Sequence, residues 1–411
     1  MKKSYFWFGQ VIVLTAANAA HAQSSVTLYG LIDTGINYTN SAQTGKAANG
    51  ALEGKSLVNM TDGSTRGYGS RWGLKGSEDL GGGLSAIFTM ENGFNIANGA
   101  LGQGGSLFGR QVFVGLKSDT FGTMTFGRQY DSQADFVSNY SPFLVAAISG
   151  TTPGDVDGLG HTRRVNNAIK YLSQNYRGLT FGGLYSLGGK AGDFTGAQVW
   201  ALGASYEAGD FSAGVGYFNA RDPNLSSFGD NPNSGGAGTN NMGSLGSATS
   251  PESNPIYAGY ASAHTFEIYS AGASYKLGKT TLAASFSHSA FESLGDLEAG
   301  PNPFDYRGTA VFNTATATVS YFATPAVQIG GGYGYTHGGG AGGNGSANYH
   351  QGIFSVQYFL SKRTEVYFYG VYQIASGTDS LGQPAVANID LMTPSSTNRQ
   401  FIGRVGIVQR F

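Results

Sequence analysis

The last residues of the sequence, FIGRVGIVQRF (residues 401–411), alternate between apolar and polar side chains. In steps of two back from the end, the residues are Phe411, Gln409, Ile407, Val405, Gly403 and Phe401, and only Gln409 is polar. The interleaved positions include Arg410 and Arg404. Successive side chains of a β-strand point to opposite faces, so this stretch predicts a strand with one apolar and one wet face. An aromatic last residue needs a reason, because chain ends are commonly polar and poorly ordered.

The same alternation recurs along the whole chain. In residues 25–39, for example, Val26, Leu28 and Ile36 alternate with Asp33 and Asn37. Alternation over such lengths is the signal of half-buried strands. It predicts sixteen strands, near residues 25–39, 65–77, 84–95, 107–117, 123–130, 163–176, 179–187, 197–208, 211–220, 263–277, 280–291, 307–323, 325–337, 348–360, 364–376 and 399–411.

The connections between these segments alternate in length. Long ones are expected at 40–64, 131–162 and 221–262 and a moderate one at 96–106. Further connections are expected at 292–306, 338–347 and 377–398, with tight turns between them. Short turns at one end and long loops at the other, with an even strand number, are typical of a transmembrane β-barrel. We therefore predict an all-β fold, a 16-stranded antiparallel transmembrane β-barrel whose inner face is wet.

Closure of the barrel supplies a place for the terminal aromatic. Lipid offers no hydrogen bonds to the backbone, so a sheet in the membrane must close on itself. The last strand is then expected to pair with the first, and Phe411 to lie in an aromatic girdle at the membrane interface. A secreted soluble β-sandwich or β-helix would also alternate, but it explains neither the rhythm of the loops nor the terminal aromatic.

The N-terminus and the composition point to an exported protein. Residues 1–22 have two lysines, an apolar run and an Ala20-His21-Ala22 pattern, which predicts a signal peptide cleaved before Gln23 and one barrel domain over residues 23–411. Charged residues are only 12% of the sequence, about half the share of a soluble domain, and cysteine is absent. The net charge of −1 argues against a nucleic-acid partner, which would require a basic face.

The motifs of enzymes and metal sites are not found in the sequence. The histidines show no i, i+4 ligand pair and stand in no nucleophile motif. The stretch around Gly278 and Lys279 partly matches a phosphate-binding loop, but alternation continues after it, so it is interpreted as a hairpin turn. We expect no catalytic residue, no metal and no cofactor, and hence no enzyme.

Five segments together resemble a known family. They are SVTLYGLIDTGINY (25–38), SRWGLKGSEDLGGGLSAIFTMENGFN (70–95), RQVFVGLKSDTFGTMTFGRQYD (110–131), RRVNNAIKY (163–171) and VGIVQRF (405–411). In this order they are similar to the general diffusion porins of Gram-negative outer membranes, of the β-proteobacterial type. The resemblance implies a homotrimer in outer-membrane lipid, each barrel with its third outer loop folded inward. It also implies a water-filled channel for passive diffusion of ions and small hydrophilic solutes.

The resemblance further implies a pore constriction with a basic wall. Arg71, Arg128 and Arg164 match the wall arginines of the family, and the adjacent Arg163 is the alternative match to Arg164. Alternation alone predicts that the side chains of Arg71 and Arg164 lie on the water-facing side of their strands. Arg128 has the same parity as its apolar neighbours, so alternation does not place it in the lumen. Its assignment to the pore wall depends on the resemblance, or on a local bulge that would turn its side chain inward.

Acidic residues are expected to face these arginines. The inward loop corresponds to residues 131–162, and Asp131 and Asp135 are favoured because they follow the matched GRQY motif. Asp33 and Glu91 lie on the polar face of their strands. Two alternatives remain open: a substrate-selective channel of the same architecture, and an adhesin or receptor barrel that acts through its outer loops.

Overall fold

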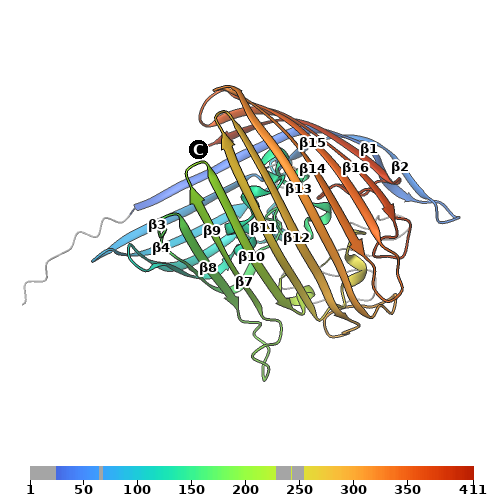
Figure 1. Ribbon diagram of the computed structural model, residues 1–411, viewed down its shortest axis with the longest axis horizontal. Helices are drawn as coiled ribbons and strands as arrows, with labels where there is room; N and C mark the ends of the chain where they lie inside the picture. The colour runs from blue at the N-terminus through green and yellow to red at the C-terminus, as the bar shows by residue number, and fades with distance from the viewer. Residues whose placement is uncertain (1–24, 64–67, 228–241, 243–253) are drawn as a thin grey trace, which may run out of the picture.

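A computed structural model describes residues 25–63, 68–227, 242 and 254–411. The described residues form one antiparallel sheet (Figure 1). Its strands are β1 (Ser25–Lys46), β2 (Leu52–Asp62), β3 (Arg71–Gly81), β4 (Leu84–Gly93), β5 (Gln111–Ser118), β6 (Gly122–Gln129), β7 (Val165–Leu172), β8 (Leu179–Ser186), β9 (Val199–Ala208), β10 (Phe211–Arg221), β11 (Thr265–Leu277), β12 (Thr280–Leu294), β13 (Gly308–Thr324), β14 (Val327–Gly339), β15 (Ala347–Phe359), β16 (Thr364–Gly377) and β17 (Arg399–Arg410).

These segments occupy sixteen positions around a barrel, because β2 and β3 share one. Residues 34–46 of β1 pair with β2, and residues 25–31 of β1 pair with β3. The two segments therefore follow one another along the same side of β1. The prediction of a 16-stranded antiparallel barrel is confirmed, and the other strands lie within a few residues of their predicted bounds.

The predicted long loop at 40–64 is wrong. β1 continues to Lys46, beyond its predicted end at residue 39, and β2 begins at Leu52 and runs back along it (Figure 1). The two strands form a long hairpin where a loop was predicted. Much of this stretch is polar on both faces, which is the pattern of a loop when it is read from the sequence. Backbone pairing with β1 stabilises it as a strand.

The barrel closes through its first and last strands, as predicted. β1 pairs antiparallel with β17, and Gly30 and Phe411 exchange backbone hydrogen bonds of 3.1 and 3.2 Å. A Cβ atom on Gly30 would lie 2.6 Å from the Phe411 ring, so glycine is needed there for the ring to pack on the strand. The ring is 45% exposed and lies at the end of the barrel that has the short turns.

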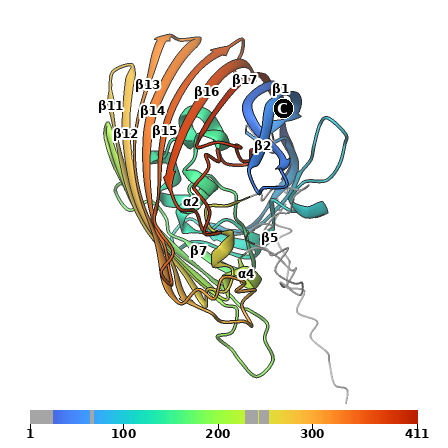
Figure 2. The ribbon, with the colours of Figure 1, turned by 90° about the vertical axis from the view of Figure 1, so that its right-hand side faces the viewer.

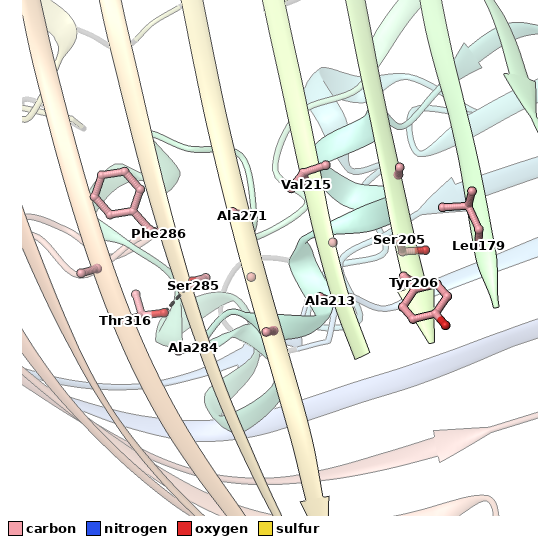
Figure 3. A pocket seen from close by; sticks show the side chains of 15 residues that line it. Leu179, Ser205, Tyr206, Ala213, Val215, Ala271, Ala284, Ser285, Phe286 and Thr316 are labelled. Carbon is pink, nitrogen blue, oxygen red and sulfur yellow. Dashed lines mark hydrogen bonds between the residues drawn. The ribbon is translucent and has the colours of Figure 1, made fainter. Parts of the chain in front are cut away.

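The two faces of the wall differ as alternation predicts. On the outer face apolar side chains are exposed, for example Val26 and Phe286. Figure 3 looks onto this face, where Val215 and Phe286 project from β10 and β12 beside a shallow depression lined mainly by alanine, glycine and serine. Ser285 and Thr316 share a 2.6 Å hydrogen bond and are buried on the inner side.

Short helices are confined to the longer connections. They are the α-helices α2 (Ser132–Phe136), α3 (Phe143–Ala146) and α4 (Pro223–Ser226), with the 3₁₀ turns η1 (Gln103–Gly105), η2 (Ser138–Tyr140), η3 (Ala147–Gly150), η4 (Pro153–Asp155) and η5 (Ala258–Tyr260). None of the helices in the described ranges is long and apolar enough to cross a membrane. Five of these elements lie between β6 and β7, inside the outline of the barrel (Figure 2).

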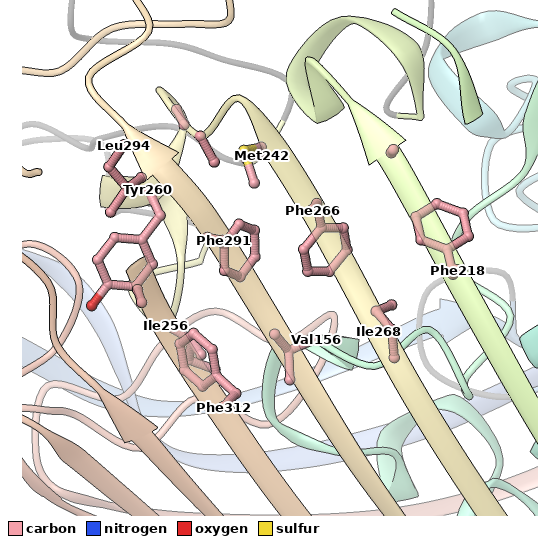
Figure 4. Close-up of a cluster of buried hydrophobic side chains, with 14 of the residues drawn as sticks. Val156, Phe218, Met242, Ile256, Tyr260, Phe266, Ile268, Phe291, Leu294 and Phe312 are labelled. Atoms are coloured by element: carbon pink, nitrogen blue, oxygen red, sulfur yellow. The ribbon is translucent and has the colours of Figure 1, made fainter. Parts of the chain in front are cut away.

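One part of the inner face is dry, which differs from the expectation of a wet interior. Four phenylalanines from neighbouring strands, Phe218, Phe266, Phe291 and Phe312, are at most 2% exposed and point inward at the end with the long loops (Figure 4). Loop residues such as Val156, Ile256 and Tyr260 pack against them. We call this group the aromatic cluster. Alternation assigns a side chain to a face, but it cannot say whether loop residues cover that face.

Candidate functional site

The connection between β6 and β7, residues 130–164, is folded against the inner wall and is called the inner loop. Its bonds to the wall include Gln133 Nε2 to Ile268 O (3.3 Å), Ser149 Oγ to Tyr369 OH (3.1 Å), Gln351 Nε2 to Thr151 O (2.8 Å) and Ser287 Oγ to Asp157 Oδ2 (2.8 Å). These wall residues belong to β11, β12, β15 and β16. The inner loop therefore crosses the interior from its origin at β6 and β7 to the far side.

Glu91 on β4 holds together one side of the wall near that origin. Its carboxylate accepts hydrogen bonds from Arg110 Nε at 2.7 Å and from Tyr29 OH at 3.0 Å. Arg71 Nε lies 3.9 Å from the same carboxylate. The charge-assisted bond fixes the position of the Arg110 guanidinium, whereas the Arg71 guanidinium is attracted to the same carboxylate and is held by a 3.1 Å hydrogen bond to Tyr68 O.

Tyr130, the first residue of the inner loop, extends this group to Arg164. Its hydroxyl accepts hydrogen bonds from Arg110 Nη2 at 3.0 Å and from Arg164 Nη2 at 2.8 Å. Burial raises the pKa of the Tyr130 phenol, but the two guanidinium groups outweigh burial and the net pKa is lowered. Arg71, Arg110 and Arg164 thus form one connected set, which we call the basic row.

A histidine of the inner loop packs beside the basic row. The His161 ring lies 5.3 Å from the Tyr130 ring and 5.0 Å from the Phe143 ring. Burial lowers the pKa of His161 to about 4, and the charges of Arg164 and Arg110 act in the same direction. The imidazole is therefore neutral near pH 7, and the charge of the row comes from its three arginines and Glu91.

The predicted loop acids lie close to the row but are already engaged. Asp131 caps α2 and accepts hydrogen bonds from Gln133 N at 2.9 Å and Ala134 N at 3.2 Å. Asp135 is paired with Lys170 of β7 at 2.5 Å. Burial raises the pKa of both carboxyl groups. Neither acid directly pairs with an arginine of the basic row.

The structure separates Arg164 from its neighbour Arg163. Arg164 joins the basic row, whereas the Arg163 guanidinium lies over the rings of Phe218 and Phe266, at 5.4 and 5.0 Å from their centroids. Arg163 thus faces the aromatic cluster, where a cation over aromatic faces is favourable.

Two other predicted residues lie elsewhere. Arg128 is paired in register with Val112, whose side chain is exposed on the outer face, and it hydrogen-bonds Gly109 O at 2.9 Å. Asp33 is fully buried, 3.3 Å from the equally buried Arg404, and accepts a 2.6 Å bond from Tyr367 OH. The structure brings neither of them to the basic row.

Sequence reasoning missed Arg110. Strict alternation from Val112 assigns Arg110 to the apolar face, so the pattern argued against it. Arg110 precedes the first residue of β5, and its side chain is turned inward by its contacts with Glu91 and Tyr130. Its place in the RQVFVGLKSD motif, next to residues that carry the family resemblance, was the available signal.

Comparisons with known proteins agree with this architecture. A family model described as Gram-negative porin matches residues 10–378 of the chain. An outer membrane porin protein of Bordetella pertussis is 41% identical over 172 residues, which are 41% of this chain and 44% of that protein. Outer membrane porin protein 32 of Delftia acidovorans is 32% identical over 229 residues, 53% of this chain and 59% of that protein. The chain spans about half the length of these curated relatives.

Solved structures share the fold. The anion-selective porin from Comamonas acidovorans superposes with a TM-score of 0.68 at 21% identity, over 95% of this chain and all of that one. The trimer form of OmpT from Vibrio cholerae superposes with a TM-score of 0.61 at 14% identity, over 94% of this chain and 99% of that one. At such identities the likeness concerns the fold alone.

Proposed function

This chain belongs to the Gram-negative porin family, and we propose that it forms a water-filled channel through which ions and small hydrophilic solutes diffuse passively. It is a protein of the outer membrane of a Gram-negative bacterium. The observation that carries the proposal is the basic row on the inner wall of a closed barrel, next to a loop that crosses the interior. Such a channel transports by diffusion, so neither catalysis nor a cofactor is part of its function.

We further propose that the channel prefers anions. The basic row holds three guanidinium groups and one carboxylate, which leaves two positive charges in excess. Arginine keeps its charge at any working pH. Arg71 retains 28% exposure of its side chain, so it meets passing solutes directly, while the buried Arg110 and Arg164 contribute through the field. The porin from Comamonas acidovorans, whose fold is similar to that of this chain, is described as anion-selective.

Reversal potentials of the reconstituted channel in a KCl gradient test both proposals. The unmodified protein is expected to conduct with an anion preference, and Arg71→Ala with Arg164→Ala is expected to shift the reversal potential toward cation selectivity. Arg128→Ala, outside the basic row, is the matched control. Negligible conductance would overturn the channel and favour a receptor or adhesin barrel. An unchanged reversal potential in the double variant would overturn the role of the row.

We propose passive diffusion rather than a substrate-specific site. Swelling of liposomes that contain the protein, measured with sugars of graded size, tests this choice. A smooth decline of rate with solute size is expected. One sugar that enters much faster than its size predicts would instead support a selective channel.

We also propose a homotrimer and a cleaved leader. Support for the trimer comes from the resemblance and from a structural neighbour described in a trimer form. Mobility on gels before and after heating tests it, and a single band at the monomer mass in both lanes would contradict it.

Residues 1–22 lie outside the described residues, and N-terminal sequencing of the mature protein should begin at Gln23.

A further inference from the structure

Three side chains that commonly bind metals meet at the end of the barrel with the long loops. Asp222 directly follows β10, His264 directly precedes β11, and Asp296 lies two residues after β12. His264 Nδ1 is 2.7 Å from Asp296 Oδ2 and 3.3 Å from Asp222 Oδ1. The three ligand atoms lie within 4.8 Å of one another, and this is the one such group in the part of the chain that the structure describes.

The donor set suits a zinc-like cation. Zinc binds imidazole nitrogen and carboxylate oxygen at about 2.0–2.2 Å, and tetrahedral ligands at these bond lengths lie roughly 3.3–3.6 Å apart. The separation between His264 and Asp222 already has this value. The contact between His264 and Asp296 must lengthen by roughly 0.7 Å, which the partly exposed side chain of Asp296 can provide by rotation.

The backbone around the three ligands is already held in place. Asp222 N donates to His264 O at 2.8 Å, His264 N to Glu292 O at 3.0 Å, and Asp296 N to Ser262 O at 3.1 Å. The second carboxylate oxygen of Asp222 accepts from Ala197 N at 3.3 Å, which turns the first toward His264. Such supporting bonds orient ligands and are typical of metal sites.

We propose that Asp222, His264 and Asp296 bind one divalent transition-metal ion, of which Zn²⁺ is the model. The ion ties the segment after β10 to the segment after β12 at the mouth of the barrel. With three protein ligands, the fourth position of the ion remains open to water. This site is separate from the basic row, and the proposal does not depend on the channel's selectivity.

Calorimetric titration of the full-length protein in detergent with Zn²⁺, after dialysis against a chelator, tests the proposal. One ion per chain is expected, and His264→Gln or Asp296→Asn should weaken binding at least about tenfold. His350→Gln is the matched control, because His350 bonds Tyr333 OH on another part of the wall. Unchanged affinity in both ligand variants, or no measurable binding, would overturn the site. Heat-modifiable gel mobility of each variant verifies that it has folded.

Discussion

The inner wall of the barrel has two unlike regions. The basic row lies on β3, on the residues just before β5 and β7, and around Glu91 of β4, and it is held by hydrogen bonds between charged and polar groups. The aromatic cluster lies on β10 to β13 and is held by ring contacts, such as the stacked Phe266 and Phe291 at 4.4 Å. The inner loop joins the two, because Arg163 faces the cluster and the next residue, Arg164, joins the row.

The difference shows how one wall serves two purposes. Buried aromatic side chains stabilise a fold through removal of apolar area from water. Charged groups in a low-dielectric wall add little net stability, since their desolvation costs offset their attraction. We infer that the aromatic cluster stabilises the mouth of the barrel and that the basic row acts on solutes. Four variants test this division.

The largest effect is expected for Phe291→Ala in the aromatic cluster. Phe291 is 1% exposed and contacts the rings of Phe266, Phe312 and Tyr257. Its truncation should lower the free energy of unfolding by about 3–5 kcal/mol, measured by urea titration of the refolded protein in vesicles. Phe286→Ala, on the outer face of the same strand, should cost less than about 1 kcal/mol. Equal losses of unfolding free energy in the two variants would show that the aromatic cluster does not stabilise the barrel more than the outer face does.

Glu91→Gln should come next and should affect both stability and selectivity. The carboxylate is 7% exposed and pairs with Arg110, so its loss leaves a buried cation without its partner, at a cost of roughly 3 kcal/mol. The excess charge of the row rises from two to three, so the reversal potential should show a stronger anion preference. Glu298→Gln removes an exposed, solvent-screened ion pair with Lys190 and should lower stability far less than Glu91→Gln does. Loss of anion preference in Glu91→Gln would contradict the role of the row.

His161→Gln should change the pH dependence of stability. The pKa of His161 is about 4 in the folded protein and about 6.5 when unfolded, so between these values the unfolded chain binds the additional proton. His161 therefore makes stability fall as the pH falls through this window, by up to about 1.4 kcal/mol per pH unit. The variant should lose this contribution in urea titrations at pH 4.5, 5.5 and 6.5.

Another group titrates in the same window with the opposite sign. Burial raises the pKa of Asp155 to about 6, and the neighbouring Asp157 adds to the shift, so its contribution falls as the pH rises. Asp155 is present in both proteins, and the difference between their slopes therefore isolates His161. His350→Gln, an exposed histidine, is the control. Identical slopes for His161→Gln and the unmodified protein would refute the neutral, buried imidazole.

The smallest effect is expected for Arg128→Gln. Its register lies on the outer face, away from the basic row, so the reversal potential should not change measurably. Loss of its hydrogen bonds to Gly109 O and Asn166 Oδ1 should cost about 1–2 kcal/mol in urea titrations. A clear shift toward cation selectivity would place Arg128 in the constriction, as the family resemblance implied.

The barrel follows from the amino-acid sequence alone. A period of two over sixteen segments, with short and long connections in turn, left few other ways to satisfy the backbone in lipid. The sequence also predicts that the last strand closes the barrel, because lipid leaves no edge strand unpaired, and that Phe411 lies on the outer face with Ile407 and Val405, because the three alternate with a set that includes Arg404 and Arg410. The one strand it missed, β2, follows the extended end of β1 and is polar in much of its length.

The side chains that meet inside the barrel are seen only in the three-dimensional structure. The Arg110 side chain points inward although alternation assigns it to the outer face. Arg163 contacts the aromatic cluster, whereas Arg164 belongs to the basic row. Asp33 on β1 pairs with Arg404 on β17. The structure also shows that four inward phenylalanines are covered by loops rather than exposed to water. Alternation depends on neighbours along one strand, whereas these contacts join residues far apart in the chain, and no local pattern records them.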